Sequence, residues 1–437
     1  MVQMKEIGVA VLGYGTVGAG VVETLLQNGE LIAERLGRRL VLRGVADLDV
    51  STDRGVNLDP ALLTTDAASL IHRADVDVVV ELIGGTGAAR EFILQALRLR
   101  KPVVTANKKL LAEYGEEIHR VADENGAEIL FEAAVGGGIP IIKSLREGLC
   151  ANRIERIYGI LNGTCNYILT RMEEEHLPFD DVLAAAQAAG YAEAEPSLDI
   201  DGLDTAHKAA VLASLAYGCI VPLEKVQVDG IRGMAAADIA YAAEMGYRIK
   251  LLAIIRGGAE GVEVSVQPTL VEHRHQLATV SGVFNAVLVK GDIVGSTLYY
   301  GRGAGRAATA SAVVADLADA ALNLRGDGRR RDLSGVHART PVVFRDPGGI
   351  VARHYLRFSM RDRPGTLAQV AAVLGAHEIG IDSVMQQEAD LDAAYVPVII
   401  VTAPAPERAL AAALAEIDER DGLTDRPTVR YRIEDFE

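Results

Sequence analysis

The sequence predicts an α/β protein with an N-terminal Rossmann-type parallel sheet, a central mixed α/β domain and a C-terminal ferredoxin-like module. Three observations lead to this prediction. Strands alternate with helices in the first third of the chain, strands follow helices in the middle, and the end of the chain has the order β-α-β-β-α-β. At 437 residues the chain is too long for one hydrophobic core. We therefore expect domains at 1–134, 135–302 and 353–437, with a linker at 323–352.

The first third of the chain is predicted to form a parallel sheet with helices on both faces. Its strand-like runs are Ile7–Leu12, Leu40–Ala46, Val76–Ile83, Pro102–Thr105 and Glu128–Phe131. Its clearest helical patterns are Val17–Leu36, Ala88–Arg100 and Lys108–Asn125.

The first strand runs into a glycine-rich turn that has the pattern G-x-G-x-x-G. It consists of Gly13, Tyr14, Gly15, Thr16, Val17 and Gly18. Glycines permit a tight turn, and the helix that follows offers backbone N–H groups to a pyrophosphate, so the turn predicts a dinucleotide site. The second strand ends at Asp47, which could accept hydrogen bonds from a ribose or be a plain surface aspartate. Arg43 and Arg54 lie close enough to leave the choice between NAD and NADP open.

The middle of the chain is predicted to form a sheet of its own with flanking helices, large enough for substrate binding and dimerisation. Its strand-like runs are Arg153–Leu161, Tyr247–Arg256, Val262–Gln267, Val283–Lys290 and Asp292–Thr297. Its helical patterns are Thr164–Glu175, Asp180–Ala189 and Gly202–Tyr217. A second glycine-rich helix start at 301–305 opens the helix Ala307–Leu322, and a helix at about 303–322 is expected to return to the first domain. The charged stretch Arg325–Leu333 is typical of a linker.

One stretch, Gly190–Leu212, concentrates charge at the start of an apolar helix. Asp204 and Lys208 are four residues apart and would share a helix face. Apolar neighbours disfavour a charged lysine and would lower its pKa, whereas Asp204 would act in the opposite direction. An ordinary surface ion pair is the alternative, and Asp199 and Asp201 could simply cap the helix near Gly202.

Composition narrows the classes of function. A formal net charge of -16 argues against nucleic acid and anionic membranes as partners. Neither an apolar run of the ~18 residues that span a membrane nor a signal-peptide pattern is present. The three scattered cysteines, Cys150, Cys165 and Cys219, are typical of reduced thiols in the cytoplasm.

Taken together, the motifs resemble those of homoserine dehydrogenase over essentially the whole chain. They are GYGTVGAGV at 13–21, TANKKLLA at 105–112, EAAVGGGIPII at 132–142, LNGTCNYIL at 161–169, GYAEAEPSLDIDGLDTAHK at 190–208 and GRGAG at 301–305. The C-terminal module is similar to an ACT domain, so the chain resembles the monofunctional form of the enzyme that carries such a domain.

The resemblance implies reversible hydride transfer between NAD or NADP and the pair L-aspartate 4-semialdehyde and L-homoserine. It implies that Lys208 is the proton donor, that Lys108 assists it, that Glu193 and Asp204 bind the substrate, and that Asp199 occupies a further acidic position. Cofactor contacts are implied at Gly13–Gly18, Lys108, Gly190 and Gly303. A monovalent cation, sodium, is implied at Glu132, Val135, Gly137 and Ile139, where carbonyl and carboxylate oxygens suit an alkali ion. We expect His207 to be a bystander, because it points away from Lys208 on the helix.

The resemblance also implies threonine biosynthesis, together with methionine and isoleucine, and feedback by L-threonine through the ACT domain. A dimerising or merely stabilising module is the alternative role for that domain. We expect a homodimer or homotetramer in the cytoplasm. Two other functions are alternatives: a non-catalytic dinucleotide-binding amino-acid sensor, which needs no proton donor, and a dehydrogenase that acylates through a cysteine, for which no thiol lies in a convincing setting.

Overall fold

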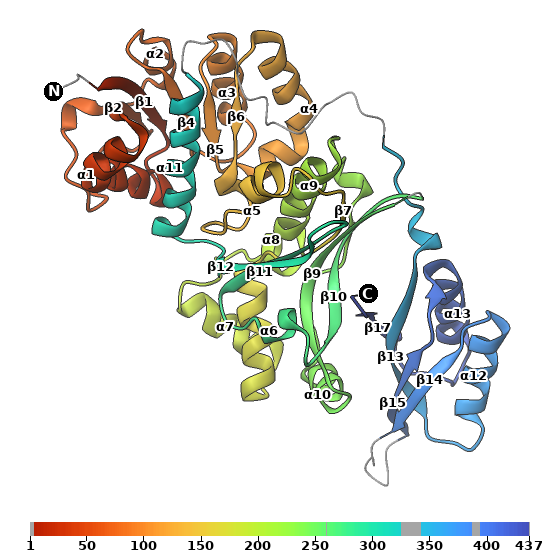
Figure 1. Cartoon of the computed structure of the whole chain (residues 1–437). Helices are drawn as coiled ribbons and strands as arrows, with labels where there is room; N and C mark the ends of the chain where they lie inside the picture. Colours follow the sequence, from red (N-terminus) through yellow and green to blue (C-terminus); the bar gives the residue numbers. More distant parts are fainter. Residues whose placement is uncertain (1–3, 259, 325–341, 387–393, 437) are drawn as a thin grey trace.

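The structure, a computed structural model, describes residues 4–258, 260–324, 342–386 and 394–436. The chain forms three regions in sequence order (Figure 1), the last of them set to one side of the central sheet. The stretch Arg325–Leu333, and with it most of the expected linker at 323–352, lies outside the described residues.

The N-terminal region contains a six-stranded sheet with the order β3-β2-β1-β4-β5-β6, in which every pairing is parallel. Its strands are β1 (Lys5–Leu12), β2 (Arg38–Ala46), β3 (Leu63–Thr64), β4 (Val78–Glu81), β5 (Val103–Thr105) and β6 (Ile129–Leu130). Its helices are α1 (Thr16–Leu36), α2 (Ala67–His72), α3 (Ala88–Arg98) and α4 (Lys108–Asn125). The predicted parallel sheet is confirmed, and the order reverses between β1 and β4, where doubly wound folds bind ligands.

The helix predicted at about 303–322 does return to the N-terminal region. It is α11 (Arg306–Asn323), and its Ala310, Val313 and Leu317 share one buried apolar cluster with β1 and α1. The two helices approach closely at Gly20, where a Cβ would lie 2.9 Å from the Arg306 carbonyl oxygen. The chain therefore leaves the nucleotide-binding region, builds the central one and comes back to close the first core.

The central region is built on long antiparallel strands, with its helices packed on one side (Figure 1). Its strands are β7 (Ile154–Ile160), β8 (Gln227–Val228), β9 (Tyr247–Gly258), β10 (Gly261–Glu272), β11 (Phe284–Gly291) and β12 (Gly295–Arg302). Its helices are α5 (Ile141–Lys143), α6 (Gly163–Glu175), α7 (Phe179–Ala188), α8 (Ser197–Ile200), α9 (Leu203–Tyr217) and α10 (Ala236–Glu244). The strand predicted at Asp292–Thr297 starts later, because Gly291 pairs with Gly295 and residues 292–294 form the hairpin turn.

The C-terminal region has the predicted β-α-β-β-α-β order. It comprises β13 (Val351–Arg361), α12 (Thr366–Ala376), β14 (Ile381–Gln386), β15 (Tyr395–Thr402), the short β16 (Ala405–Pro406), α13 (Glu407–Glu419) and β17 (Val429–Glu434). Helices α12 and α13 pack on one face and close a small apolar core that includes Leu356, Phe358, Val370 and Leu410.

The C-terminal region, expected as a domain at 353–437, shares a sheet with the central region. Strand β17 pairs with β10 in parallel, with Thr269 opposite Arg432, so one eleven-stranded sheet runs from β12 through β10 and β17 to β14. Strand β10 continues well beyond the short β8 that covers part of the same edge. Pairing with β17 supplies partners for the backbone groups of β10 from Thr269 to Val271, and such groups are costly to leave without a hydrogen bond when they are buried.

Polar contacts reinforce this junction. Asp238 of α10 is fully buried and accepts hydrogen bonds from the Tyr355 hydroxyl, at 2.8 Å, and from Arg357 Nη2, at 2.9 Å. On the other side of the sheet edge, Arg432 of β17 donates to Glu263 of β10 over 2.7 Å, and both side chains are buried. The two regions are therefore held together by buried charge pairs as well as by the sheet.

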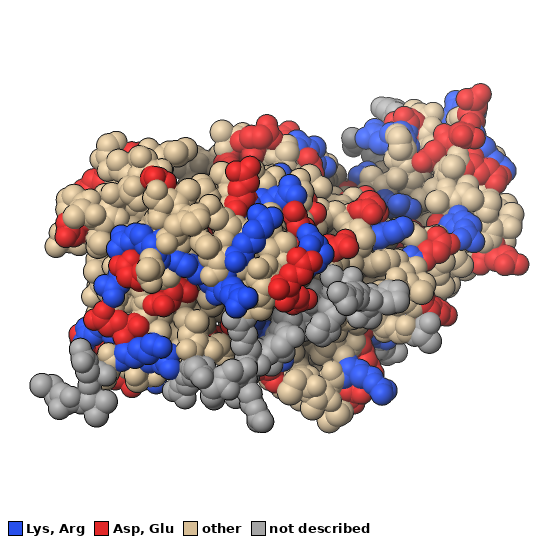
Figure 2. All heavy atoms as spheres, turned by 90° about the horizontal axis from the view of Figure 1, so that it is seen from above, with Lys and Arg blue, Asp and Glu red and all other residues tan. Residues whose placement is uncertain are grey.

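The outer surface mixes both signs of charge. On the face seen in Figure 2, lysine and arginine side chains are interspersed with aspartate and glutamate. Within the described part of the chain, no helix is long and apolar enough to cross a membrane.

The buried pair at the junction leads to a first prediction. Asp238→Ala removes the acceptor and leaves Arg357 partly buried without its carboxylate, so we expect a loss of about 3 kcal/mol in the free energy of unfolding of the C-terminal region. Chemical unfolding followed by circular dichroism measures it. Asp425→Ala, which removes an exposed pair with Arg426, is the matched control and should cost less than about 1 kcal/mol. Equal losses in the two variants would contradict a special role for Asp238.

Candidate active site

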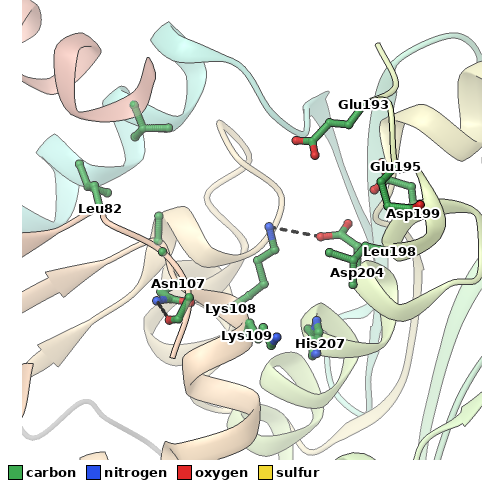
Figure 3. A pocket seen from close by; sticks show the side chains of 14 residues that line it. Leu82, Asn107, Lys108, Lys109, Glu193, Glu195, Leu198, Asp199, Asp204 and His207 are labelled. Carbon is green, nitrogen blue, oxygen red and sulfur yellow. Dashed lines mark hydrogen bonds and ion pairs between the residues drawn. The ribbon is translucent and has the colours of Figure 1, made fainter. Parts of the chain in front are cut away.

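A cavity of about 380 Å³ lies where the N-terminal and central regions meet (Figure 3). The N-terminal region supplies residues from the ends of β4 and β5 and the start of α4. The central region supplies the loop before α8, α8 itself and the start of α9. The principal lining residues are Leu82, Gly84, Gly85, Asn107, Lys108, Glu193, Glu195, Leu198, Asp199, Asp204 and His207. The carboxyl ends of parallel strands are the usual place for a ligand in such a fold.

Asp204 lies between two lysines from different regions. Its Oδ2 accepts a hydrogen bond from Lys208 Nζ at 2.6 Å, one helical turn further along α9. Its Oδ1 is 3.2 Å from Lys108 Nζ, at the first residue of α4. Figure 3 shows Lys108 and Asp204 extending toward one another from opposite walls of the cavity. The pair predicted on one helix is therefore a three-residue cluster that joins the two regions.

Burial and charge act against each other on Asp204. Burial raises its pKa, but the charges of Lys208 and Lys108 and the hydrogen bonds from Lys208 and Asn162 outweigh burial and hold the pKa below its usual range. Asp204 is therefore an anion throughout the physiological range of pH.

Asn162 connects two carboxylates of this site. Its Nδ2 donates to Asp204 Oδ2 at 2.9 Å and to Asp199 Oδ1 at 2.7 Å. Burial raises the pKa of Asp199, against the Asn162 hydrogen bond and with the help of the nearby Asp204 charge. The alternative that Asp199 and Asp201 cap α9 is wrong: Gly202 is the N-cap without a side-chain hydrogen bond, and Asp201 pairs with Arg232.

Lys208 lies behind Asp204 and is not among the residues that line the cavity. It is 8% exposed, and its Nζ donates to the Leu161 carbonyl oxygen at 2.7 Å as well as to Asp204. The amine therefore has a carboxylate and a carbonyl oxygen as acceptors within the protein. The surface ion pair considered as the alternative is excluded by this burial.

Three polar residues on the nucleotide-binding side hold the cavity wall in place. The Glu81 carboxylate, fully buried at the end of β4, accepts hydrogen bonds from the N–H groups of Ile83 and Gly84 and from the Thr105 hydroxyl. Asn107 caps α4 through Leu110 N and donates to the Gly85 carbonyl oxygen at 2.7 Å. This arrangement fixes the first turn of α4 and hence the position of Lys108.

Sequence reasoning missed these supporting residues. Thr105, Asn107 and Asn162 lie inside the motifs that carry the family resemblance. The sequence therefore marked their positions but did not indicate what these side chains do. Glu81 lies inside the strand predicted at Val76–Ile83, but β4 ends at Glu81, just before Gly84 and Gly85. A carboxylate at the end of a buried parallel strand is the pattern that could have identified it.

The glycine turn has the geometry expected of a dinucleotide site. Gly13 has φ +98°, and a Cβ there would lie 2.6 Å from the backbone of Leu82. At Gly18 a Cβ would lie 2.0 Å from the Gly13 carbonyl oxygen, so β1 and α1 could not approach as they do. Around Gly15, the N-cap of α1, a Cβ would meet no described atom within 4 Å. The turn is thus closed behind the first and third glycines and open at the second, where a pyrophosphate would sit.

The other residues of the turn divide between core and surface. Tyr14 is buried, its N–H donates to Asp47 Oδ2 at 2.5 Å, and Val17 lines the cavity. Thr16 is exposed at the first position of α1. Asp47 therefore braces the turn, which neither of the two alternatives for this residue had included.

The loop before α8 forms the far wall of the cavity. Glu193 lines it and in Figure 3 lies across the cavity from Lys108, while Gly190 is exposed with φ +75°. His207 also lines the cavity, and burial lowers its pKa. The structure thus places His207 on the cavity wall, whereas the expectation that it has no role of its own stays a prediction.

The segment expected to hold a cation is a buried turn. Glu132 is 3% exposed, and its carboxylate accepts the N–H groups of Ile142, at 2.9 Å, and Lys143, at 2.7 Å. Burial raises the pKa of Glu132, against these two hydrogen bonds. Gly137 has φ +55° and lies so close to Gly303 that a Cβ would be 2.5 Å from the Gly303 carbonyl oxygen. Val135 and Ile139 are buried on either side of the turn.

Comparisons with known proteins agree with this architecture. Residues 13–132 match the model described as homoserine dehydrogenase, NAD binding domain, residues 140–318 match the homoserine dehydrogenase model, and residues 354–419 match the ACT domain model.

Curated relatives match along nearly the whole chain. A homoserine dehydrogenase of Neisseria gonorrhoeae is 44% identical, with 99% of each chain covered, and that of Bacillus subtilis is 38% identical with the same coverage. Among solved structures, a homoserine dehydrogenase from Thiobacillus denitrificans is 44% identical with a TM-score of 0.92, again covering 99% of both chains. A hyperthermophilic archaeal homoserine dehydrogenase in complex with NADPH is 28% identical with a TM-score of 0.62, and covers 72% of this chain and 98% of its own.

The glycine turn leads to a second prediction. In Gly18→Ala the new methyl group collides with the Gly13 carbonyl, so we expect the dissociation constant for NADPH or NADH to rise at least about tenfold. Fluorescence of the reduced nicotinamide measures it. Gly29→Ala lies in the same helix, where a Cβ would meet no described atom within 4 Å, and should leave binding unchanged while stabilising α1 by up to about 1 kcal/mol. Unchanged affinity in Gly18→Ala would refute this location for the cofactor.

Proposed function

The chain belongs to the homoserine dehydrogenase family, and from this premise we propose roles for the residues around the cavity. The activity is NAD(P)-dependent oxidoreduction between L-homoserine and L-aspartate 4-semialdehyde. The observation that carries the assignment of roles is the cluster of Asp204 with Lys108 and Lys208 at the boundary of the two regions. A non-catalytic amino-acid sensor is not favoured, since such a protein has no need of a buried amine, that of Lys208, beside the Asp204 carboxylate.

We propose that Lys208 is the proton donor. The nicotinamide, when bound, supplies or accepts the hydride. As hydride reaches the aldehyde carbon, negative charge develops on the oxygen, and an ammonium group both neutralises it and delivers the proton. In the direction of homoserine oxidation the hydroxyl proton returns to the lysine amine. Lys208 is supported by its burial and its fixed position against Asp204 and Leu161.

Lys108 is proposed to assist from the cofactor side. It lines the cavity at the start of α4, which the N-terminal region positions through Asn107. Its charge lies 3.2 Å from Asp204. A substrate that carries its own ammonium group can replace Lys108 at Asp204, which would free the lysine to face the developing charge.

The substrate is proposed to bind to the acidic wall. Asp204 and Glu193 are the acceptors for the ammonium and hydroxyl groups of homoserine, as charge-assisted hydrogen bonds require. Asp199 belongs to the same acidic wall, tied to Asp204 through Asn162. Gly190 and Gly303 complete the proposed cofactor contacts, together with Gly13–Gly18 and Lys108.

A monovalent cation, sodium, is proposed at the buried turn formed by Glu132, Val135, Gly137 and Ile139. The proposal is supported by the hard oxygens of this turn, its main-chain carbonyls and the buried Glu132 carboxylate, which also accepts the N–H groups of Ile142 and Lys143. Gly303 lies directly against Gly137, so an ion here would stiffen the segment that leads from β12 into α11.

We propose that the cofactor is either NADP or NAD, and one observation supports each of them. NADP is supported by the archaeal relative, whose structure was solved in complex with NADPH. NAD is supported by Asp47, whose carboxylate stands at the end of β2 beside the glycine turn.

We propose homo-oligomerisation and feedback by L-threonine through the ACT region. At the two ends of the eleven-stranded sheet, the edge strands β12 and β14 expose Leu298, Tyr300 and Val384, which suits contact with a second copy. Feedback is supported by the ACT match at 354–419 and by the shared sheet that connects this region to the central one.

The proton-donor assignment gives a third prediction. Lys208→Met should lower kcat by about 10²–10⁴-fold, as expected for the loss of a general acid, and leave the dissociation constant for the cofactor within about twofold, because Lys208 lies on the substrate side. Steady-state kinetics and cofactor titration measure the two effects. Lys225→Met, an exposed lysine in the same region, should match the unaltered enzyme. A normal kcat in Lys208→Met would remove Lys208 as the donor.

The cation site gives a fourth prediction. Replacing sodium chloride by choline chloride at constant ionic strength should lower homoserine oxidation, measured with NAD⁺ and NADP⁺ in turn. Glu132→Gln keeps one oxygen acceptor for the start of α5 but lacks the charge, so the sodium concentration for half-maximal activity should rise at least about tenfold. If the variant responds to sodium as the unaltered enzyme does, Glu132 is not part of the site.

A further inference from the structure

A buried lysine outside the cavity has no part in the reaction described so far. Lys250 of β9 is 2% exposed, and no carboxylate of the described residues forms an ion pair with it. Its Nζ donates instead to the Val280 carbonyl oxygen at 2.7 Å and to the Asn166 amide oxygen at 3.3 Å. An ammonium group is costly to bury without a paired carboxylate, and exceptions of this kind concentrate where a residue serves function.

The amine of Lys250 keeps most of its charge at pH 7. Burial lowers the pKa of Lys250 to about 8, and the charge of Glu173 on α6 acts in the opposite direction. A protonated amine has three N–H donors, so Lys250 is able to serve both of its acceptors at once.

Asn166 of α6 holds the same loop as Lys250, the loop at 280–283 that leads into β11. Asn166 is 2% exposed. Its Nδ2 lies 3.0–3.3 Å from three carbonyl oxygens, those of Val280, Gly282 and Phe284. Asn166 therefore ties alternate residues of this loop to α6, and Lys250 ties the first of them to β9.

Thr170 adds a third contact to the same loop, one turn further along α6. Its hydroxyl accepts the N–H of Gly282 at 3.1 Å and donates to the Asn166 carbonyl oxygen at 2.7 Å. We call Lys250, Asn166 and Thr170 the loop clamp, because all three side chains bind the backbone of residues 280–284.

The clamped loop lies directly against the start of α6. At Gly163, the first residue of this helix, a Cβ would lie 2.8 Å from the Val283 carbonyl oxygen, so loop and helix are in contact without room for a side chain. The preceding residue, Asn162, is the N-cap, and its Oδ1 accepts the N–H of Cys165 at 2.8 Å. The Nδ2 of the same side chain is the group that binds both carboxylates of the acidic wall.

We propose that Lys250 is a positioning residue for the substrate site. It fixes the loop at 280–283 against the start of α6, and thereby fixes the Asn162 amide that binds Asp199 and Asp204. Each step of this route is a direct contact, and polar groups that bind a ligand keep their geometry only when such supporting hydrogen bonds hold them. The inference rests on the proposed binding of substrate at Asp204.

The test compares enzyme kinetics of the full-length protein and its Lys250→Met variant. Methionine keeps an unbranched apolar side chain but donates no hydrogen bond. We expect the KM for L-homoserine to rise at least about tenfold and kcat to fall by less than about threefold, because the proposed proton donor stays in place on α9. The dissociation constant for the reduced cofactor should stay within about twofold.

Lys101→Met is the matched control. Lys101 Nζ also donates to two backbone carbonyl oxygens, those of Ile71 at 2.6 Å and Arg73 at 2.7 Å, but within the N-terminal region. This variant should lower the unfolding temperature and leave the KM for L-homoserine unchanged. An equal rise of KM in both variants would overturn the proposal, since the effect would then follow from the loss of any lysine that holds a loop.

A double-mutant cycle tests the route through Asn162. Asn162→Ala already lacks the amide, so a further Lys250→Met should change the KM by less than about twofold. Two effects that multiply in full would overturn this route. If Lys250→Met does not fold, Thr170→Val removes a smaller part of the loop clamp and replaces it in both measurements, with an expected rise in KM of at least about threefold. An unchanged KM in Thr170→Val would then overturn the proposal.

Asp204→Asn distinguishes a failure of this inference from a failure of the proposed function. A KM for L-homoserine that is unchanged in Asp204→Asn would overturn substrate binding at Asp204, and the role of Lys250 with it. A KM that is raised in Asp204→Asn but unchanged in Lys250→Met would overturn only the role of Lys250.

Discussion

The constraint on which the site depends is the placement of one buried carboxylate between two amines. Asp204 binds Lys208 on its own helix and Lys108 from the nucleotide-binding region. Because a buried carboxylate without counter-charges would be neutral, the two lysines determine that Asp204 is ionised. The same contacts join the N-terminal and central walls of the cavity. Asn107, Asn162 and Glu81 serve mainly to hold this arrangement.

The second organising feature is the continuity of the large sheet. Strand β17 pairs with β10, and Asp238 and Arg432 anchor the C-terminal region through buried charges. The C-terminal module therefore continues the sheet of the central region. On the central side of this junction, Gly230 packs closely against Ile200, and Gly202 lies near Asp229, so the loop after β8 is in direct contact with the α8–α9 turn.

The nucleotide-binding region and the return helix form a comparable unit. Gly18 and Gly20 allow close approaches, of α1 to the end of β1 and of α1 to α11. The chain enters and leaves the central region within a short distance, since Gly137 packs on Gly303. The turn proposed for the cation thus lies where both connections between the regions pass.

The fold class, most helices and strands to within a few residues, the glycine turn and the Asp204–Lys208 pair could be predicted from the sequence. These features depend on local periodicity and short spacings. The sequence did not reveal that Lys108 contacts Asp204, that Asn162 joins two carboxylates, that His207 faces the cavity, or that β17 completes the edge of β10. Each of these depends on residues far apart in the chain, and their distances follow from how two regions pack. Packing alone determines whether a titratable group is buried and which charges surround it, so the charge of Asp204 is a property of the tertiary structure.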